Sequence, residues 1–280
     1  MRTRNYHTHT HRCGHALGDV PDYCREAVRQ GLDVLGFTDH TPLPDGRWPS
    51  VRMDMQELPG YLAALDDADR QFPDLLVLHG LECEYVEAFV PYYREEFLGR
   101  CGLDYLVGGA HWYPHAGEWV GIYGTPMDPS MLKSYADYLV AGMESGLFSF
   151  VAHPDLFGVS YPDWDRHAEA AAHAICQAAA ALSVPLEINT YGFRKPYLAS
   201  RTGKRPKYPW FPFWEMAATW DVPVVVSSDA HRPEDVLANM DQGEALARRL
   251  GLKQVALTDA EENARQRRPA ENAPPQQDRE

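Results

Sequence analysis

Residues 6–15, which read YHTHTHRCGH, decide how the rest of this chain is interpreted. If residues 4–10 form a strand, His7 and His9 point to the same face, because side chains alternate along a strand. Two imidazoles about 6–7 Å apart on one face can share a metal ion. Thr, Arg, Cys and Gly interrupt the run, unlike a homopolymeric tag. Cys13-Gly14 indicates a turn, after which His15 returns from a loop. The pattern therefore predicts a metal role for His7 and His9.

Short apolar runs alternate with segments of helical spacing along the chain. The runs at 33–38, 75–85, 105–110, 148–152, 185–189 and 222–227 are typical of buried parallel strands. Helical spacing is found at 19–30, 53–72, 91–100, 129–145, 166–182, 213–220 and 234–250. This alternation predicts an α/β fold with a parallel sheet, either open or closed into a barrel. The sequence has no glycine-rich phosphate loop, which disfavours a nucleotide-binding fold.

Histidine and acidic residues recur where the expected strands end. They are His7 with His9, His40, Glu82, His111, His153, and Asp229 with His231. Barrels of the (β/α) type build their sites from the carboxyl ends of many strands. An open sheet gathers its site at one switch point, from fewer strands. The positions therefore favour a barrel with its site at the carboxyl ends of the strands.

Several of these candidates also have a structural explanation. Asp39 could orient a neighbouring imidazole, or it could cap a turn. Glu82 and Glu84 share a strand face beside a buried run, so at least one carboxylate is expected to need a metal or a cation. His153 precedes a proline, which holds it in extended backbone. Cys13 could be a thiolate ligand, although a small buried thiol is the commoner role.

Composition restricts the possible function classes. The length of 280 residues is normal for a single α/β barrel, and a 45% hydrophobic content supplies a large core. The net charge of −14 makes a nucleic-acid partner unfavourable, because such partners need a basic surface. Five scattered cysteines favour reduced thiols and a cytoplasmic location. No apolar run is long enough for a membrane span, and no signal peptide is recognisable, so no membrane partner is expected.

The motifs HTHT, CGHA, FTDH, GLECEY, GGAHW, VAHPD and SSDAH follow one another between Tyr6 and His231. As a set they resemble the polymerase-and-histidinol-phosphatase (PHP) family of metal phosphoesterases, although a single HxH or DxH would be a weak signal. The resemblance implies a distorted (β/α)7 TIM-like barrel with two or three divalent transition-metal ions, which could be Zn, Mn, Fe or Co. Residues 1–260 would form this single domain. Residues 261–280 lack aromatic side chains and are expected to be a disordered tail.

The resemblance also implies a set of metal ligands. The first metal would be held by His7, His9, Glu82 and Asp229, and the second by His15, His40 and His231. A third would be held by His111 and His153 with a bridging Glu82. Residues 187–195, EINTYGFRK, and the following Tyr208-Pro209 resemble the histidinol-phosphatase branch of the family. This implies hydrolysis of L-histidinol phosphate in histidine biosynthesis.

The sequence departs from the family pattern at two places. Asn5 stands where the family often has an acidic residue, and no basic residue follows the segment 153–155 before Arg166. Phosphate binding is therefore expected to rest on Arg194, Lys195 or Arg201. Arg194 is the best candidate for a fork-like contact to phosphoryl oxygens, and its alternative is a surface arginine.

Two further roles are expected from the residue types. Asp39 or a metal-bound water could protonate the leaving alkoxide. An aromatic wall against an imidazole-bearing substrate could be formed by Trp112, Tyr113, Tyr123 and Tyr161, which could equally be loop anchors.

Three function classes remain open from the sequence. The first is a small-molecule phosphatase acting on histidinol phosphate. The second is a PHP-type phosphoesterase acting on nucleotides, oligonucleotides or another small phosphate monoester, and the acidic balance of the chain counts against a duplex. The third is a non-catalytic metal-binding module, which the intact ligand set disfavours. The sequence leaves the oligomeric state open.

Overall fold

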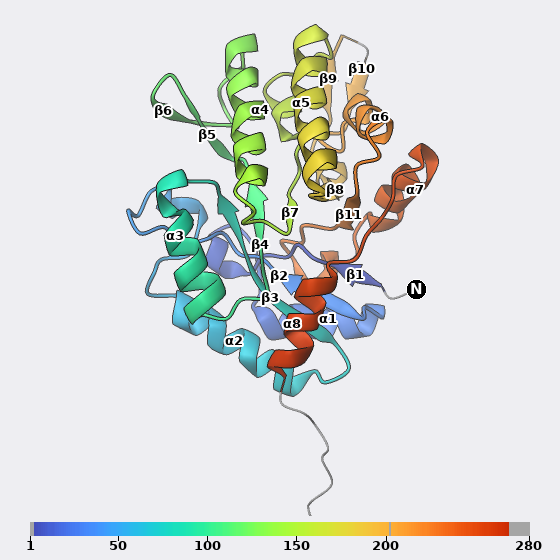
Figure 1. Ribbon diagram of the computed structural model, residues 1–280. Coiled ribbons are helices and arrows are strands. Elements are labelled where there is room, and N and C mark those ends of the chain that lie inside the picture. The colour runs from blue at the N-terminus through green and yellow to red at the C-terminus, as the bar shows by residue number, and fades with distance from the viewer. Residues whose placement is uncertain (1–2, 202, 269–280) are drawn as a thin grey trace, which may run out of the picture.

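The computed structural model describes residues 3–201 and 203–268, and Figure 1 shows the arrangement of their helices and strands. Seven strands form one sheet in the order β1-β2-β3-β4-β7-β8-β11, and all neighbouring pairs are parallel. Their bounds are Arg4–Asn5, Val34–Phe37, Leu76–Glu84, Tyr105–Gly109, Phe150–Val151, Leu186–Asn189 and Val224–Ser227. The spatial order of the strands follows the chain order, as in a barrel built from successive β/α units.

The two edge strands of this sheet meet, so that the sheet nearly closes on itself. Beyond β1, Thr8 forms a parallel bridge with Ala230, and the His9 N–H donates to the Ala230 carbonyl at 2.9 Å. The Asn5 amide adds a side-chain link across the same seam, donating to the Ser228 hydroxyl at 2.9 Å. The expected distorted (β/α)7 barrel is thus confirmed. The first strand is shorter than the pattern predicts, because only residues 4–5 pair regularly with β2.

Helices surround the strands (Figure 1). They are α1 Val20–Gln30, α2 Leu58–Gln71, α3 Val90–Tyr92 with the following π-helix Tyr93–Arg100, α4 Pro129–Glu144, α5 Arg166–Leu182, α6 Phe211–Thr219 and α7 Met240–Leu250. Aspartates cap the amino-terminal ends of α1, α4 and α5. The side chains of Asp19, Asp128 and Asp165 accept hydrogen bonds from backbone amides in the first turn. Among the residues described, no helix combines the length and apolarity that crossing a membrane requires.

Two short hairpins lie outside the barrel sheet. One pairs β5 Trp112–His115 with β6 Glu118–Gly121, and the other pairs β9 Leu198–Ser200 with β10 Gly203–Arg205. The sequence pattern predicts neither hairpin, because strands of three or four residues carry too little alternation to be recognised. The first hairpin directly follows His111, so it lies beside the expected site.

The last helix among the described residues is α8 Thr258–Arg267, which lies across the amino-terminal ends of the barrel strands (Figure 1). Leu257, Ala260 and Ala264 pack into the apolar cluster that fills the barrel, together with Val34, Leu76, Leu78, Tyr105, Val107, Phe150 and Val225. The tail expected from residue 261 is therefore wrong for residues 261–267. Charged residues dominate this segment, but its small apolar side chains close the barrel. The remainder of the expected tail, 269–280, lies outside the described residues.

Polar contacts hold α8 in place. Arg267 pairs with Asp69 and, at 2.7 Å, with Asp104, whose carboxylate is buried. Glu261 accepts hydrogen bonds from the Tyr6 hydroxyl at 2.8 Å and from Arg4 Nε at 2.6 Å. These contacts join the last helix to strands from the first half of the chain.

We expect Arg267→Ala to lower the free energy of unfolding by about 3 kcal/mol, because it leaves the buried Asp104 carboxylate without its cation. Urea denaturation followed by circular dichroism measures the change. Arg248→Ala is the matched control, since Arg248 forms an exposed ion pair with Glu244 on α7. This substitution should lower the free energy of unfolding by about 0.5 kcal/mol or less. Equal losses for the two variants would contradict the role given to α8.

Candidate active site

All nine ligands expected from the sequence come together at the carboxyl ends of the barrel strands. A cavity of about 330 Å³ is lined by His9, His15, His40, Glu82, His111, His153, Asp229 and His231. The ninth, His7, is fully buried beneath them. The strand ends bring these residues together, since each ligand except His15 lies within four residues of the end of a strand, and His15 returns from the loop after the turn His11–Cys13. A volume of this size suits a small-molecule ligand.

Glu82 lies at the centre of this group and is 1% exposed. Its carboxylate oxygens lie 3.0 to 3.7 Å from ring nitrogens of five histidines, which are His7, His9, His40, His111 and His153. Within the described part of the chain, neither oxygen has a hydrogen-bond partner. A buried carboxylate is costly unless a cation or hydrogen bonds satisfy it. The surrounding donor set of imidazoles and carboxylates therefore fits a divalent transition metal.

A second part of the group is formed by the first and last strands of the barrel. The Nε2 atoms of His7 and His9 are 2.9 Å apart, and Asp229 Oδ1 lies 3.2 Å from His9 Nε2. Because both imidazole nitrogens face the same carboxylates, the arrangement is typical of ligands that share a cation. Asp229 Oδ1 also has no hydrogen-bond partner among the described residues.

The electrostatics of the site favour anionic carboxylates, and the imidazoles differ among themselves. Burial acts to lower the pKa of His7 and His111, but neighbouring carboxylates outweigh it and raise both values. Burial acts to raise the pKa of Glu82 and Asp229, but neighbouring histidines outweigh it and hold both values well below the usual range. Burial lowers the pKa of His40 well below its usual value and that of His231 to about 3. Neutral imidazoles keep a lone pair free for a metal, and carboxylates supply the negative charge.

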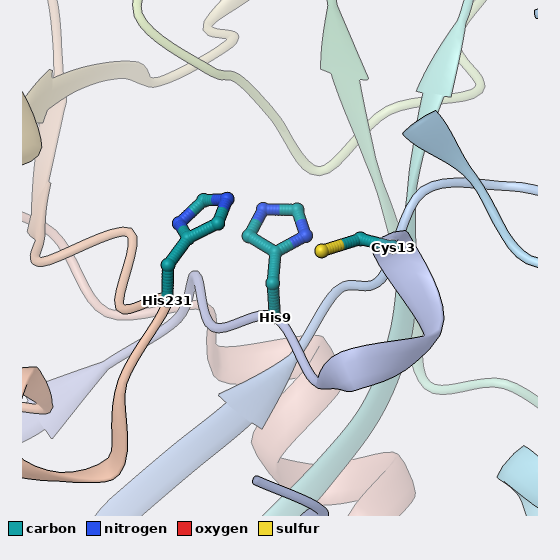
Figure 2. A group of neighbouring side chains, drawn as sticks. All are labelled: His9, Cys13 and His231. Atoms are coloured by element: carbon teal, nitrogen blue, oxygen red, sulfur yellow. The ribbon is translucent and has the colours of Figure 1, made fainter. Parts of the chain in front are cut away.

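His15 lies at the rim of the cavity, and its Nδ1–H donates to the Cys13 carbonyl at 2.8 Å. Its ring centroid is 4.8 Å from that of His231. Figure 2 shows the Cys13 thiol pointing at the edge of the His9 ring, on the side away from His231. Ligand-type atoms of His9, Cys13 and His231 lie within 4.8 Å of one another. Burial raises the pKa of the Cys13 thiol to about 12, in keeping with a small buried thiol.

Sequence reasoning missed a layer of polar residues on β8 behind the ligands. Glu187 accepts from His7 Nδ1 at 2.8 Å and from the His153 N–H at 3.0 Å. Asn189 donates to Glu187 at 2.8 Å and to Asp229 at 3.0 Å. Because Glu187 holds His7 Nδ1, the Nε2 atom is directed toward the other ligands. The available signal was an acid and an amide spaced by two residues at the end of a buried strand.

Glu84 also orients a ligand, with the help of a buried arginine. Its carboxylate accepts from Arg52 Nη2 at 2.8 Å and pairs with His111 Nδ1 at 3.0 Å. Burial alone would raise the pKa of Glu84, but Arg52 and His111 together lower it to about 2. At least one of these two strand carboxylates was expected to need a metal or a cation. Glu84 has a cation in Arg52, and Glu82 faces the histidines.

The general-acid role expected for Asp39 disagrees with its position. Asp39 is fully buried behind His9 and does not line the cavity. It accepts hydrogen bonds from the Thr10 N–H at 2.8 Å and the Thr10 hydroxyl at 2.5 Å, and lies 3.8 Å from His9 Nδ1. These contacts hold the turn that carries His9, which matches the alternative of an orienting or capping aspartate.

Three expected substrate-binding residues lie away from the cavity. Arg194 donates to the carbonyls of Ala238 and Ser228, at 3.0 and 2.7 Å, so both terminal nitrogens of its guanidinium are hydrogen-bonded to the backbone. Arg201 is exposed and pairs with Asp163. Tyr161, which was expected in the aromatic wall, also lies outside the cavity, and its hydroxyl donates to Asp165 at 2.8 Å. None of these three side chains lines the cavity, so their expected contacts with the substrate stay predictions without support from the geometry.

Lys195 and Trp112, by contrast, line the cavity as expected. The Lys195 ammonium lies 4.0 Å from the centroid of the Tyr191 ring, and burial lowers its pKa. Tyr123 also belongs to the wall, whereas Tyr113 is completely buried and serves as a loop anchor. The wall further includes Tyr208, which sequence reasoning had not assigned to it.

Comparison with known proteins places the chain in a family. The model of the PHP domain matches residues 5–191. A protein of Deinococcus radiodurans named "Probable histidinol-phosphatase" is 34% identical over 243 residues, which cover 82% of this chain and 86% of that protein.

Solved structures share the fold. The histidinol phosphate phosphatase of Lactococcus lactis, in complex with zinc, L-histidinol and phosphate, has a TM-score of 0.71 at 17% identity, covering 91% of this chain and 96% of that one. A proposed histidinol phosphatase of Listeria monocytogenes has a TM-score of 0.70 at 20% identity, covering 86% and 99%. Because the PHP model matches more than half of the 280 residues, the chain belongs to the PHP-domain family.

Proposed function

We propose that this chain is a metal-dependent phosphomonoesterase that hydrolyses L-histidinol phosphate to L-histidinol and phosphate in histidine biosynthesis. The observation that carries the proposal is the convergence of imidazoles and carboxylates around Glu82 in a cavity with one lysine and several aromatic rings. The name of the D. radiodurans relative and the ligands of the L. lactis structure support this substrate. A cytoplasmic location is part of the proposal, supported by five free cysteines.

The ligands divide into overlapping groups that would hold two or three divalent ions. His7, His9 and Asp229 converge on one side of Glu82, and His111 and His153 face its other oxygen. His40 and His231, with His15 at the rim, complete the cavity floor. Zn, Mn, Fe and Co all suit mixed imidazole and carboxylate ligation. When bound, such ions act as Lewis acids that activate water and offset charge on a phosphoryl group.

The remaining cavity residues are suited to hold the two ends of the substrate. Among the described residues, Lys195 is the only lysine or arginine that lines the cavity, so its ammonium is placed to donate to phosphoryl oxygens. Trp112 and Tyr123 offer ring surfaces for an imidazole. The net charge of −14 favours approach of a substrate that carries an amine over a polyanion.

We expect protein purified without chelators to hold roughly two or more transition-metal ions per chain, because both Glu82 carboxylate oxygens and Asp229 Oδ1 have no hydrogen-bond partner among the described residues. Asp229→Asn should reduce the metal content by roughly one ion, since it removes a negative charge at the shared carboxylate. Elemental analysis of the purified protein measures both values. Asp163→Asn, outside the cavity, is the control. A content below one ion per chain after metal addition would contradict the assignment.

Substrate preference is the second expectation. We expect kcat/KM for L-histidinol phosphate to exceed the values for p-nitrophenyl phosphate, nucleoside monophosphates and a single-stranded oligonucleotide, measured with the same metal. The reason is that the cavity offers a phosphate-binding lysine together with aromatic walls. If the generic ester is hydrolysed equally well, the substrate assignment fails and only the family-level activity remains.

Lys195→Met should lower kcat/KM for the phosphate ester by about 2 kcal/mol, equivalent to roughly 30-fold, because it removes a charge-assisted contact. Arg201→Met is the matched control, since Arg201 lies in the same basic segment but pairs with Asp163 outside the cavity. Steady-state kinetics on both variants measure the difference. An equal loss in the two variants would show that Lys195 acts through the general charge of the segment.

A further inference from the structure

Arg52 lies in the loop between β2 and α2 and is only 5% exposed. Its guanidinium donates from Nη1 to the Thr41 carbonyl and from Nη2 to Glu84, both at 2.8 Å. It also lies 5.2 Å from the ring of Trp48 and 5.7 Å from the ring of Trp112. The two tryptophan rings stack with their centroids 4.5 Å apart. Arg52 is therefore held from several sides, although it is not itself a ligand.

Glu84 connects Arg52 to His111. Its other oxygen, Oε1, lies 3.0 Å from His111 Nδ1. With Nδ1 held in this way, His111 Nε2 is directed toward Glu82, 3.7 Å away. A hydrogen bond from one ring nitrogen to a carboxylate fixes the tautomer and the ring orientation of a metal-binding histidine.

Thr41 connects Arg52 to the other side of the same group. The Thr41 N–H and hydroxyl donate to the Glu82 carbonyl at 2.9 and 2.8 Å, and Thr41 directly follows His40. One guanidinium thus contacts the chain just beyond β2 and the end of β3, and through Glu84 it reaches the histidine that follows β4.

We propose that Arg52 is a positioning residue that preorganises the group of His40, Glu82 and His111 for binding one metal ion. The ligand-type atoms of these three residues lie within 4.8 Å of one another. The planar guanidinium can donate to Thr41 and Glu84 at once while it packs on the tryptophans, which a lysine cannot do. The inference rests on the proposed metal-dependent function of the site, but it concerns the binding of the ion alone.

Titration of the metal-free protein with Co²⁺, followed by visible absorption, tests this inference, because the spectrum reports the coordination of the ion. Arg52→Met should lower the affinity for the most weakly bound Co²⁺ ion by about 10- to 100-fold and alter the absorption band of that ion. Arg52→Lys should bind Co²⁺ as Arg52→Met does, because a lysine lacks the planar guanidinium that donates to Thr41 and Glu84 at once. Glu84→Gln keeps a hydrogen-bond acceptor for His111, so this variant should lose less Co²⁺ affinity than Arg52→Met.

Arg47→Met is the matched control, because Arg47 packs 5.3 Å from the same Trp48 ring but forms its ion pair with Asp45. It should titrate like the wild type. Circular dichroism identifies any variant that does not fold, and Arg52→Lys and Glu84→Gln then carry the test. Unchanged titrations and spectra in the folded variants would overturn the inference, as would an equal loss in Arg47→Met.

A kinetic measurement separates positioning from a general structural effect. At saturating metal, the kcat of Arg52→Lys should return toward the wild-type value with KM for the phosphate ester unchanged, because excess ion captures His111. A KM that stays altered at saturating metal would contradict positioning. If the wild type does not hydrolyse histidinol phosphate, the proposed substrate fails, whereas the Co²⁺ titration still decides the role of Arg52.

Discussion

The buried carboxylate of Glu82 is the constraint on which the rest of the site depends. It lies near the end of β3, a nine-residue strand that is buried throughout, and five imidazoles surround it. An isolated ionised carboxylate in such a place costs several kcal/mol or more. No lysine or arginine among the described residues pairs with it, so the balance of charge requires protonated histidines or bound cations. The surrounding imidazoles and carboxylates form a donor set that suits a divalent transition metal.

Polar residues behind the ligands support them, and two of the ligands themselves lie on strained backbone. Carboxylates hold two of the imidazoles, with Glu187 on His7 and Glu84 on His111. His153 and Asp229 have φ angles of 31° and 49°, a region that residues other than glycine seldom adopt. Both are stabilised from β8, where Glu187 accepts the His153 N–H and Asn189 donates to Asp229. Strain of this kind persists only where the surroundings fix the conformation, which is common at functional sites.

The sequence predicts the ligand group well because strand ends and two-residue spacing are local properties. His7 with His9, and Asp229 with His231, could be recognised from alternation and from the apolar runs before them. Side-chain direction in loops is not local. Residues 191–194 form a 3₁₀ turn, and the backbone becomes extended at Lys195. Arg194 at the end of the turn faces the backbone, whereas Lys195 lines the cavity. The closing helix was missed because its polar surface resembles a solvated tail, and only its small residues reveal the packing.

The position of the ligands relative to the barrel seam links ion binding to the fold. The seam between the first and last strands is held by the bridge between Thr8 and Ala230 and by the Asn5 side chain. His9, which follows the first strand, and Asp229, which follows the last, lie next to this seam, with His9 Nε2 and Asp229 Oδ1 3.2 Å apart. A cation shared by these two residues would connect strands that few backbone hydrogen bonds join. Free energy gained by binding such an ion is also free energy that stabilises the closed barrel. The opposite end is closed by α8, whose contacts involve no ligand, so the two ends of the barrel are stabilised by different means.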